Sequence, residues 1–210
     1  MEPKCVLVAD DHPMFREALK FALARVAPDA TVLEAGQLSD AGEAARTAAR
    51  LDLILLDLRM PGAEGCTGIA LLHAERPETP ILVISSAEGE EVRARARSYG
   101  AIGFLPKTAS LDILEGAIGD ALAGRFAAPQ PAAGGDVADM AARVATLTPT
   151  EMRVLLGVLA GRLNKQIAFD LQIGLATVKA HMTMIMRKLD VRSRTQVALA
   201  ARALDITPPD

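Results

Sequence analysis

The feature that most constrains the fold is an alternation of two hydrophobic patterns through residues 1–124. Short apolar runs rich in β-branched residues alternate with segments whose apolar residues recur at helical spacing. Five such strand–helix units predict an α/β fold, a doubly wound (βα)5 domain on a parallel sheet. The predicted strands are Cys5–Ala9, Thr31–Glu34, Leu53–Leu56, Ile81–Ile84 and Ile102–Leu105, and the predicted helices are 13–27, 39–50, 66–75, 88–99 and 110–124.

The chain beyond residue 124 carries a different pattern. Residues 125–146 are rich in Ala, Pro and Gly, and their prolines oppose a continuous helix, so we expect a linker in which 136–144 could form a short helix. Residues 147–210 lack a strand pattern and predict a second, all-α domain of four helices. The first of these helices should begin at a capping box formed by Thr148 and Glu151. The four helices are predicted at 149–160, 164–171, 175–189 and 193–204.

The net charge of −3 hides an asymmetry between the two predicted domains. Residues 1–124 carry a net charge of −7, whereas residues 147–210 carry +4. An acidic front half and a basic back half indicate two modules with different partners, and the basic module is suited to nucleic acid. No apolar run approaches the ~20 residues that a membrane helix needs, and the N-terminus is unlike a secretory signal peptide. We therefore expect a cytoplasmic protein without a membrane partner.

Cysteine and histidine are too few for a disulfide framework or a zinc site. Cys5 opens an apolar run and is expected to pack as a small hydrophobic side chain, and Cys66 stands alone. His12, His73 and His181 are widely separated in the sequence. The candidate functional residues must therefore be sought among the charged side chains.

Polar side chains follow four of the five predicted strands, at the point where each strand ends. Asp10 and Asp11 follow the first strand, and Asp57 follows the third. Ser85 follows the fourth strand and Lys107 the fifth. Because ligands of open parallel sheets bind at the carboxyl ends of the strands, these side chains form a convergent set.

This set of residue types suits phosphoryl chemistry. Neighbouring carboxylates repel each other, so Mg2+ is their natural counter-charge. A carboxylate beside Mg2+ can attack a phosphoryl group and keep it as an acyl phosphate. Lys107 could neutralise a phosphoryl oxygen, and the Ser85 hydroxyl could donate a hydrogen bond to it. Each residue alone has an ordinary alternative, because an Asp pair often starts a turn and a lysine is often solvated. Only the joint placement of these residues at the strand ends favours a functional site over these ordinary alternatives.

Four segments of the front half resemble the signature set of receiver domains: V-L-V-A-D-D-H at 6–12, L-I-L-L-D-L-R-M-P-G at 53–62, I-S-S-A at 84–87 and G-F-L-P-K-T at 103–108. The resemblance spans residues 1–124. It implies that Asp57 is the phosphoacceptor. It also implies that Asp10 and Asp11, together with Asp57 and the backbone carbonyl of Arg59, hold Mg2+.

The same resemblance implies a switch that responds to the phosphoryl group. Ser85 would be the switch hydroxyl, Lys107 the phosphate-binding lysine and Phe104 the aromatic switch residue, although Phe104 could instead be ordinary core packing. Two departures concern the lysine loop and the aromatic residue. Thr108 follows the lysine where the family commonly has proline, and Phe104 lacks the hydroxyl of the more familiar tyrosine. The geometry of the Lys107–Thr108 loop is therefore left open.

The predicted helix at 175–189 has two contrasting faces. Val178, Met182, Ile185 and Leu189 recur at helical spacing and form a buried face. A short helix, a tight turn and a longer helix with a basic face are the arrangement that places a helix in the major groove. A small helical bundle with a merely solvated positive face is the alternative. The opposite face carries Lys179, Ala180, Thr183, Arg187 and Lys188.

The back half resembles the LuxR-type helix-turn-helix, and the whole chain resembles a NarL/FixJ-type response regulator. The resemblance rests on L-T-P-T-E-M-R-V-L at 147–155, N-K-Q-I-A-F-D-L at 164–171, T-V-K-A-H at 177–181 and R-K-L-D-V-R-S-R-T-Q at 187–196. It implies that 175–189 is the recognition helix. Gly174 and Met184 depart from the usual Ser and Asn. The implied base-reading residues are Lys179, Ala180 and Thr183, and those near the DNA backbone are His181, Arg187, Lys188 and Arg194.

The resemblance implies a phosphorylation switch. A sensor histidine kinase, or a small phosphodonor, would phosphorylate Asp57, and the change would release the DNA-binding half or favour a homodimer on paired half-sites. One alternative is an orphan regulator of the same fold that binds DNA without phosphorylation. The other is a Mg2+-dependent phosphohydrolase, but such enzymes commonly place nucleophile and acid two residues apart, unlike the adjacent Asp10 and Asp11. We therefore expect a regulator and not an enzyme.

Overall fold

A computed structural model describes residues 3–63, 65–87, 89–126 and 136–208. Its front half is built on one parallel sheet with strand order β2-β1-β3-β4-β5. The apolar, β-branched runs form the strands because the sheet is covered on both faces. This topology confirms the predicted doubly wound fold. The strands are β1 Cys5–Ala9, β2 Thr31–Ala35, β3 Leu53–Leu56, β4 Ile81–Ser85 and β5 Ala101–Pro106.

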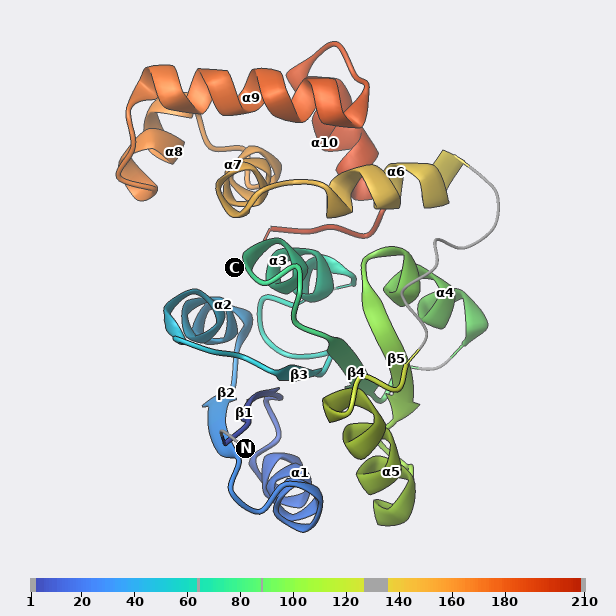
Figure 1. Ribbon diagram of the computed structural model, residues 1–210. Coiled ribbons are helices and arrows are strands. Elements are labelled where there is room, and N and C mark those ends of the chain that lie inside the picture. Colours follow the sequence, from blue (N-terminus) through green and yellow to red (C-terminus); the bar gives the residue numbers. More distant parts are fainter. Residues whose placement is uncertain (1–2, 64, 88, 127–135, 209–210) are drawn as a thin grey trace.

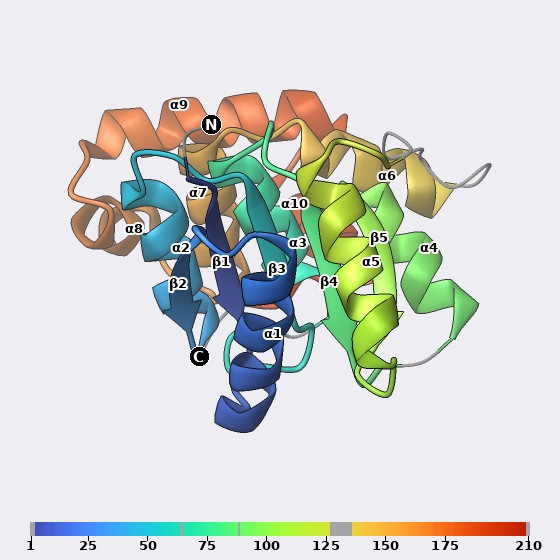
Figure 2. The same ribbon diagram turned by 60° about the horizontal axis from the view of Figure 1, so that its bottom comes forward.

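Five helices cover the two faces of the sheet (Figures 1 and 2). Helices α1 and α5 pack with one face, and α2, α3 and α4 cover the other. Helix α2 ends three residues before the predicted residue 50, because the chain must extend there to enter β3. The helices are α1 Pro13–Val26, α2 Leu38–Thr47, α3 Thr67–Glu75, α4 Glu90–Ser98 and α5 Leu111–Leu122.

The back half is a helical domain that lies against α3 (Figure 1). The short helix considered possible within the linker is formed, as α6, whereas the prolines of the linker lie outside the described residues. The capping box of α7 is present, with Glu151 N donating to Thr148 Oγ1 and Thr148 N donating to the Glu151 carboxylate. The helices are α6 Asp136–Ala145, α7 Pro149–Leu159, α8 Asn164–Asp170, α9 Leu175–Leu189 and α10 Arg194–Ala203.

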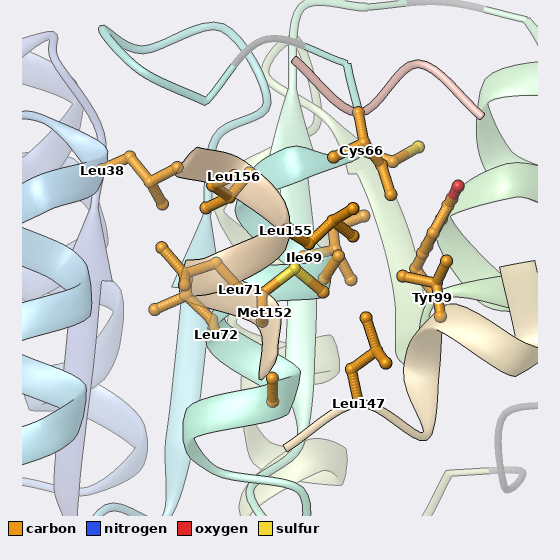
Figure 3. Packing of buried hydrophobic residues seen from close by; sticks show 14 of the residues in the cluster. Leu38, Cys66, Ile69, Leu71, Leu72, Tyr99, Leu147, Met152, Leu155 and Leu156 are labelled. Carbon is orange, nitrogen blue, oxygen red and sulfur yellow. The ribbon is translucent and has the colours of Figure 1, made fainter. Parts of the chain in front are cut away.

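Helix α3 is buried on both sides, which joins the two domains through a common core. Its residues 67–74 include no Asp, Glu, Lys or Arg, and an apolar helix of this kind needs cover all round. Ile69 and Leu72 are fully buried, while Leu71 packs in the same cluster as Met152 and Leu155 of α7 (Figure 3). The helical domain therefore completes the hydrophobic cover of the receiver-like half.

An ion pair adds to this contact between the halves. Arg153 Nε of α7 lies 3.1 Å from Glu75 Oε1 at the end of α3, and the Glu75 side chain is only 6% exposed. A carboxylate this buried needs a partner, because unpaired burial of a charge is costly. The pair therefore favours the packed arrangement of α3 and α7.

Within the described residues, no helix is both long and apolar enough to cross a bilayer.

The capping box gives a stability prediction. Replacing Thr148 by Ala removes the acceptor for Glu151 N, so Thr148→Ala should lower the free energy of unfolding by about 1 kcal/mol. Ser110→Ala is the matched control, since Ser110 precedes α5 but makes no side-chain cap bond. Urea unfolding followed by circular dichroism measures both variants. Equal effects of the two substitutions would contradict the assigned role of the box.

Candidate functional site

The acidic side chains meet at the carboxyl edge of the sheet because β1 and β3 are adjacent parallel strands. Asp10 directly follows β1 and Asp57 directly follows β3, and each is 1% exposed. Ligand atoms of Asp10, Asp11, His12 and Asp57 all lie within 4.8 Å of one another. The structure thus brings together the carboxylates that the sequence analysis grouped. It also adds His12, which that analysis had set aside as isolated.

Lys107 lies between the two buried carboxylates. Its Nζ is 2.7 Å from Asp10 Oδ2 and 2.7 Å from Asp57 Oδ2. Burial opposes the charge of Lys107, but the two carboxylates that it contacts outweigh burial and raise the pKa of the ammonium group. The lysine is therefore a fixed cation at the point where the carboxylates would otherwise repel each other. The Lys107–Thr108 peptide bond, left open by the sequence, is trans.

The two oxygens of Asp57 have different surroundings. Ser85 Oγ donates a hydrogen bond of 2.7 Å to Asp57 Oδ1, and Arg59 N donates one of 3.1 Å to the same atom. Asp57 Oδ2 faces Lys107. One oxygen is thus held by neutral donors while the other faces a cation, so the carboxylate is fixed in orientation. Here Arg59 contacts Asp57 through its amide, whereas the sequence analysis assigned a role to its carbonyl.

The start of α1 contributes two residues that the sequence analysis did not assign to the site. His12 Nδ1 lies 2.6 Å from Asp11 Oδ1 and 3.3 Å from Lys107 Nζ. The Phe15 ring lies under the ammonium of Lys107, with 4.9 Å from Nζ to the ring centroid, a cation–π distance. The signal for both was their position at the start of α1, where His12 is the N-cap residue that follows Asp11 and Phe15 lies in the first turn. This position became informative only in the folded structure, because Lys107, which both side chains contact, is 95 residues from His12 in the sequence.

Phe104 lies on β5, on the side of α4. It is half-buried and packs against the core cluster that includes α3 and α4. The guanidinium of Arg93, on α4, lies 5.7 Å from the centroid of the Phe104 ring. Although the Phe104 ring lacks the hydroxyl of tyrosine, its electron-rich face has the Arg93 guanidinium as a partner in this position.

Helix α9 presents the predicted base-reading residues to solvent. Lys179, Ala180 and Thr183 are exposed, while Val178 and Ile185 are buried on the opposite side, as the spacing predicted. Figure 1 shows α9 on the side of the helical domain that faces away from the sheet. The receiver-like half therefore leaves this surface uncovered.

The remaining candidates for DNA contact differ in their surroundings. Arg187 is exposed and His181 is half-buried. Lys188 Nζ donates to Glu151 Oε2 at 2.6 Å and to the Thr146 carbonyl at 2.8 Å. Burial tends to raise the pKa of Glu151, but the bond from Lys188 and the backbone amide of its capping box lower it overall. Lys188 therefore anchors α9 to the start of α7.

Arg194 is also bound within the domain. Its guanidinium donates to Asn164 Oδ1 at 2.8 Å and to the carbonyl of Arg162. These bonds join the start of α10 to the start of α8. Of the positively charged candidates in the back half, Lys188 and Arg194 thus have internal partners, whereas Lys179 and Arg187 extend into solvent.

The fold and the two sites together define a class of protein. One domain has a buried, oriented carboxylate at the edge of a (βα)5 sheet, and the other is a helix-turn-helix with an exposed basic helix. This combination is the domain architecture of a response regulator. The chain matches the response regulator receiver domain over residues 6–119 and the luxR family of bacterial regulatory proteins over residues 145–201.

Curated relatives match this chain over nearly its whole length. The chain is 37% identical to the glycerol metabolism activator of Pseudomonas putida, over 96% of both chains. It is 35% identical to the nitrate/nitrite response regulator protein NarL of Escherichia coli K12, over 94% of both. The crystal structure of full-length FixJ from B. japonicum covers 96% of this chain and 97% of its own, with a TM-score of 0.51 and 27% identity. The protein belongs to the NarL/FixJ-type family of response regulators, whose standard function is phosphorylation-controlled DNA binding.

The bonds of Arg194 predict that this arginine stabilises the helical domain. Arg194→Ala leaves Asn164 and the Arg162 carbonyl without their donor, so it should lower the free energy of unfolding by about 1 kcal/mol. Arg192→Ala removes the same charge from an exposed neighbour and is the matched control. Thermal unfolding should distinguish the two variants. Unchanged stability in Arg194→Ala would contradict a structural role for this arginine.

Proposed function

We propose that transfer of a phosphoryl group to Asp57 controls sequence-specific DNA binding by α9. The observation that carries the proposal is the geometry around Asp57: a carboxylate 1% exposed, bonded to Ser85 and adjacent to Lys107. Such an arrangement orients a nucleophile and supplies groups that can bind the oxygens of an incoming phosphoryl group. A sensor histidine kinase is the proposed donor, and a small acyl phosphate can replace it.

The residues around Asp57 fit a magnesium ion. The oxygens of Asp10, Asp11 and Asp57 lie within reach of one ion, and hard carboxylate oxygens are the ligands that Mg2+ prefers. We propose these three carboxylates and the Arg59 carbonyl as the protein ligands. When bound, Mg2+ would neutralise charge on the phosphoryl oxygens and so lower the barrier to transfer.

The protein's own groups have separate roles in the proposed transfer. An oxygen of Asp57 attacks the phosphorus atom, and the bond from phosphorus to the imidazole nitrogen of the donor breaks. Lys107 Nζ, now shared between Asp10 and Asp57, would bind a phosphoryl oxygen. Ser85 Oγ would leave Asp57 Oδ1 and donate to another phosphoryl oxygen. The movement of Ser85 would vacate space that Phe104 can fill, at the cost of its contact with Arg93.

Helix α9 supplies the proposed recognition surface. Lys179 suits the acceptors of guanine, and the methyl groups of Ala180 and Thr183 suit thymine. We propose His181 and Arg187 on the side nearer the DNA backbone, where contacts give affinity without sequence information. Lys188 and Arg194 belong to the same side, and their internal bonds add a structural role.

Several broader features follow from this proposal. We assign residues 1–124 to the receiver, 125–146 to the linker and 147–210 to the DNA-binding domain. Loss of phosphate from Asp57 would be self-hydrolysis, so we do not propose an enzyme that turns over a separate substrate. Because its target is chromosomal DNA, we place the protein in the cytoplasm. Palindromic half-sites would be bound by a homodimer.

The proposal predicts a phosphodonor-dependent change in DNA affinity. Duplexes selected from a random pool by the full-length protein provide the ligand. Acetyl phosphate with Mg2+ should tighten binding by a factor within about 5 to 150, the usual range of coupling between sites. Asp57→Asn should abolish the change, whereas Asp112→Asn, an exposed carboxylate on α5, should preserve it.

The outcomes discriminate between the alternatives. Equal DNA binding under all conditions would favour an orphan regulator that does not use phosphate. Multiple turnover of a small phosphomonoester would favour the phosphohydrolase. Absence of DNA binding in every state would contradict the role proposed for α9.

The recognition surface predicts a loss of discrimination. Lys179→Ala should cost about 1–3 kcal/mol of preference for selected over scrambled duplexes, because a base contact is lost. Arg187→Ala removes one exposed positive charge from the side of α9 that we place nearer the DNA backbone, so it should weaken binding to both duplexes alike. Fluorescence anisotropy at constant salt measures both. A uniform loss in Lys179→Ala would instead assign Lys179 to the phosphate backbone.

A further inference from the structure

His12 belongs to the group of possible cation ligands at the acidic site, yet the proposed function gives it no role. It is the N-cap residue of α1, but its side chain makes no capping bond. The imidazole lies beside the carboxylates instead, with Nδ1 2.6 Å from Asp11 Oδ1 and 3.3 Å from Asp10 Oδ1. The position of this side chain therefore serves the acidic site and not the helix.

The contact between His12 and Lys107 indicates which imidazole nitrogen carries a proton. His12 Nδ1 lies 3.3 Å from Lys107 Nζ, at the long end of hydrogen-bond distances. An ammonium group can only donate, so Nδ1 is the acceptor and the proton of the neutral ring is on Nε2. A protonated Nδ1 would instead place a second cation against the ammonium group. Nδ1 therefore presents a lone pair to the site.

Asp11 Oδ1 lacks a positively polarised partner. The atom is buried, and no donor in the described part of the chain makes a hydrogen bond to it. His12 Nδ1 is only 2.6 Å away, but a nitrogen without a proton cannot donate to this oxygen. Two lone-pair atoms at this separation repel each other unless a cation binds both. A buried oxygen of this kind thus indicates that an ion belongs beside it.

The spacing of the lone-pair atoms suits a single ion. Neighbouring ligands of an octahedral ion lie about 3 Å apart when each is about 2.1 Å from the ion. The separations from His12 Nδ1 to Asp11 Oδ1 and to Asp10 Oδ1, 2.6 and 3.3 Å, lie on either side of this value. The imidazole nitrogen is therefore placed as a ligand of the same ion as the carboxylates.

A nitrogen ligand changes the class of ion that the site favours. Mg2+ prefers oxygen ligands, whereas imidazole suits first-row transition-metal ions such as Co2+, Ni2+ and Zn2+. Three carboxylates without His12 would form an all-oxygen set. The His12 side chain is 65% exposed, so the ring can adjust to an ion without disturbing packed neighbours.

We propose that His12 Nδ1 is a ligand of the cation bound by Asp10, Asp11 and Asp57, and that this ligand gives the site a preference for first-row transition-metal dications. The inference rests on the proposed function for the location of the cation site, and it deepens that function by naming the class of ion. The site would be filled by such an ion at a concentration well below that required of Mg2+.

Isothermal titration calorimetry of the untagged, full-length protein with CoCl2 and with MgCl2 tests the proposal. Because the carboxylates also discriminate between these ions, the informative quantity is the change in the ratio of the two affinities. His12→Asn is the test variant, since asparagine is a favourable N-cap residue and its amide oxygen can still accept from Lys107. His181→Asn, on α9, is the matched control for histidines outside the site.

His12→Asn should lower the affinity for Co2+ by about tenfold or more, because even an outer partner of a metal ligand contributes this much. The affinity for Mg2+ should change by less than about twofold, because its oxygen ligands remain. The visible absorption of bound Co2+ should also shift in this variant, since a nitrogen ligand is lost. His181→Asn should change none of these quantities. Asp11→Asn should weaken both ions, which would place them at one site.

Three results would overturn the proposal. An equal loss of Co2+ and Mg2+ affinity in His12→Asn would make His12 a positioning residue for Asp11. Unchanged affinity for both ions would remove His12 from the site altogether. Binding of Co2+ that survives Asp11→Asn would place this ion elsewhere on the protein.

The proposed function is tested separately, by phosphorylation of Asp57 with acetyl phosphate and Mg2+. If Asp57 is phosphorylated but His12→Asn leaves the ratio of the two affinities unchanged, the ligand role of His12 is wrong and the proposed function stands. If Asp57 accepts no phosphoryl group, the proposed function fails, whichever ion the site prefers.

Discussion

The arrangement of the receiver depends on the balance between two buried carboxylates and one lysine. Asp10 and Asp57 are each 1% exposed and would repel each other without a cation between them. Lys107 supplies it at 2.7 Å from both, and it can do so only because β5 ends on the same edge of the sheet as β1 and β3. A phosphoryl group on Asp57 would compete for this lysine, so the interaction that stabilises the resting site is also the one that the signal would change.

A second constraint is the composition of α3. A helix covered by the sheet on one side normally presents charged residues on the other, but residues 67–74 contain none. The helical domain covers that outer side with Met152, Leu155 and Leu156, and Arg153 pairs with Glu75 at its end. The receiver and the DNA-binding domain therefore share buried surface. Since α3 directly follows the connection from Asp57, this shared surface lies close in the chain to the proposed site of phosphorylation.

The sequence analysis was most successful where a local pattern had a single structural solution. The capping box at Thr148 and Glu151, and the apolar residues of α9 that recur every three or four positions, predicted helix positions correctly. It missed the participation of His12 and the cation above Phe104, because both depend on side chains brought in from other elements. The bonds of Arg194 to α8 were missed for the same reason. The charge-free stretch of α3 was a readable signal of double burial that the analysis did not use.

By itself, the sequence determined the order and type of the elements, the parallel sheet and the convergence of Asp10, Asp57, Ser85 and Lys107. These follow from hydrophobic periodicity and from the rule that parallel strands present their carboxyl ends at one edge. Only the tertiary structure decided which side of the helical domain meets the receiver, that α9 is uncovered, and that Leu204–Thr207 pairs with Gly65. These contacts join residues as far apart in the chain as Gly65 and Ile206, and their formation depends on shape and buried area that no local pattern encodes.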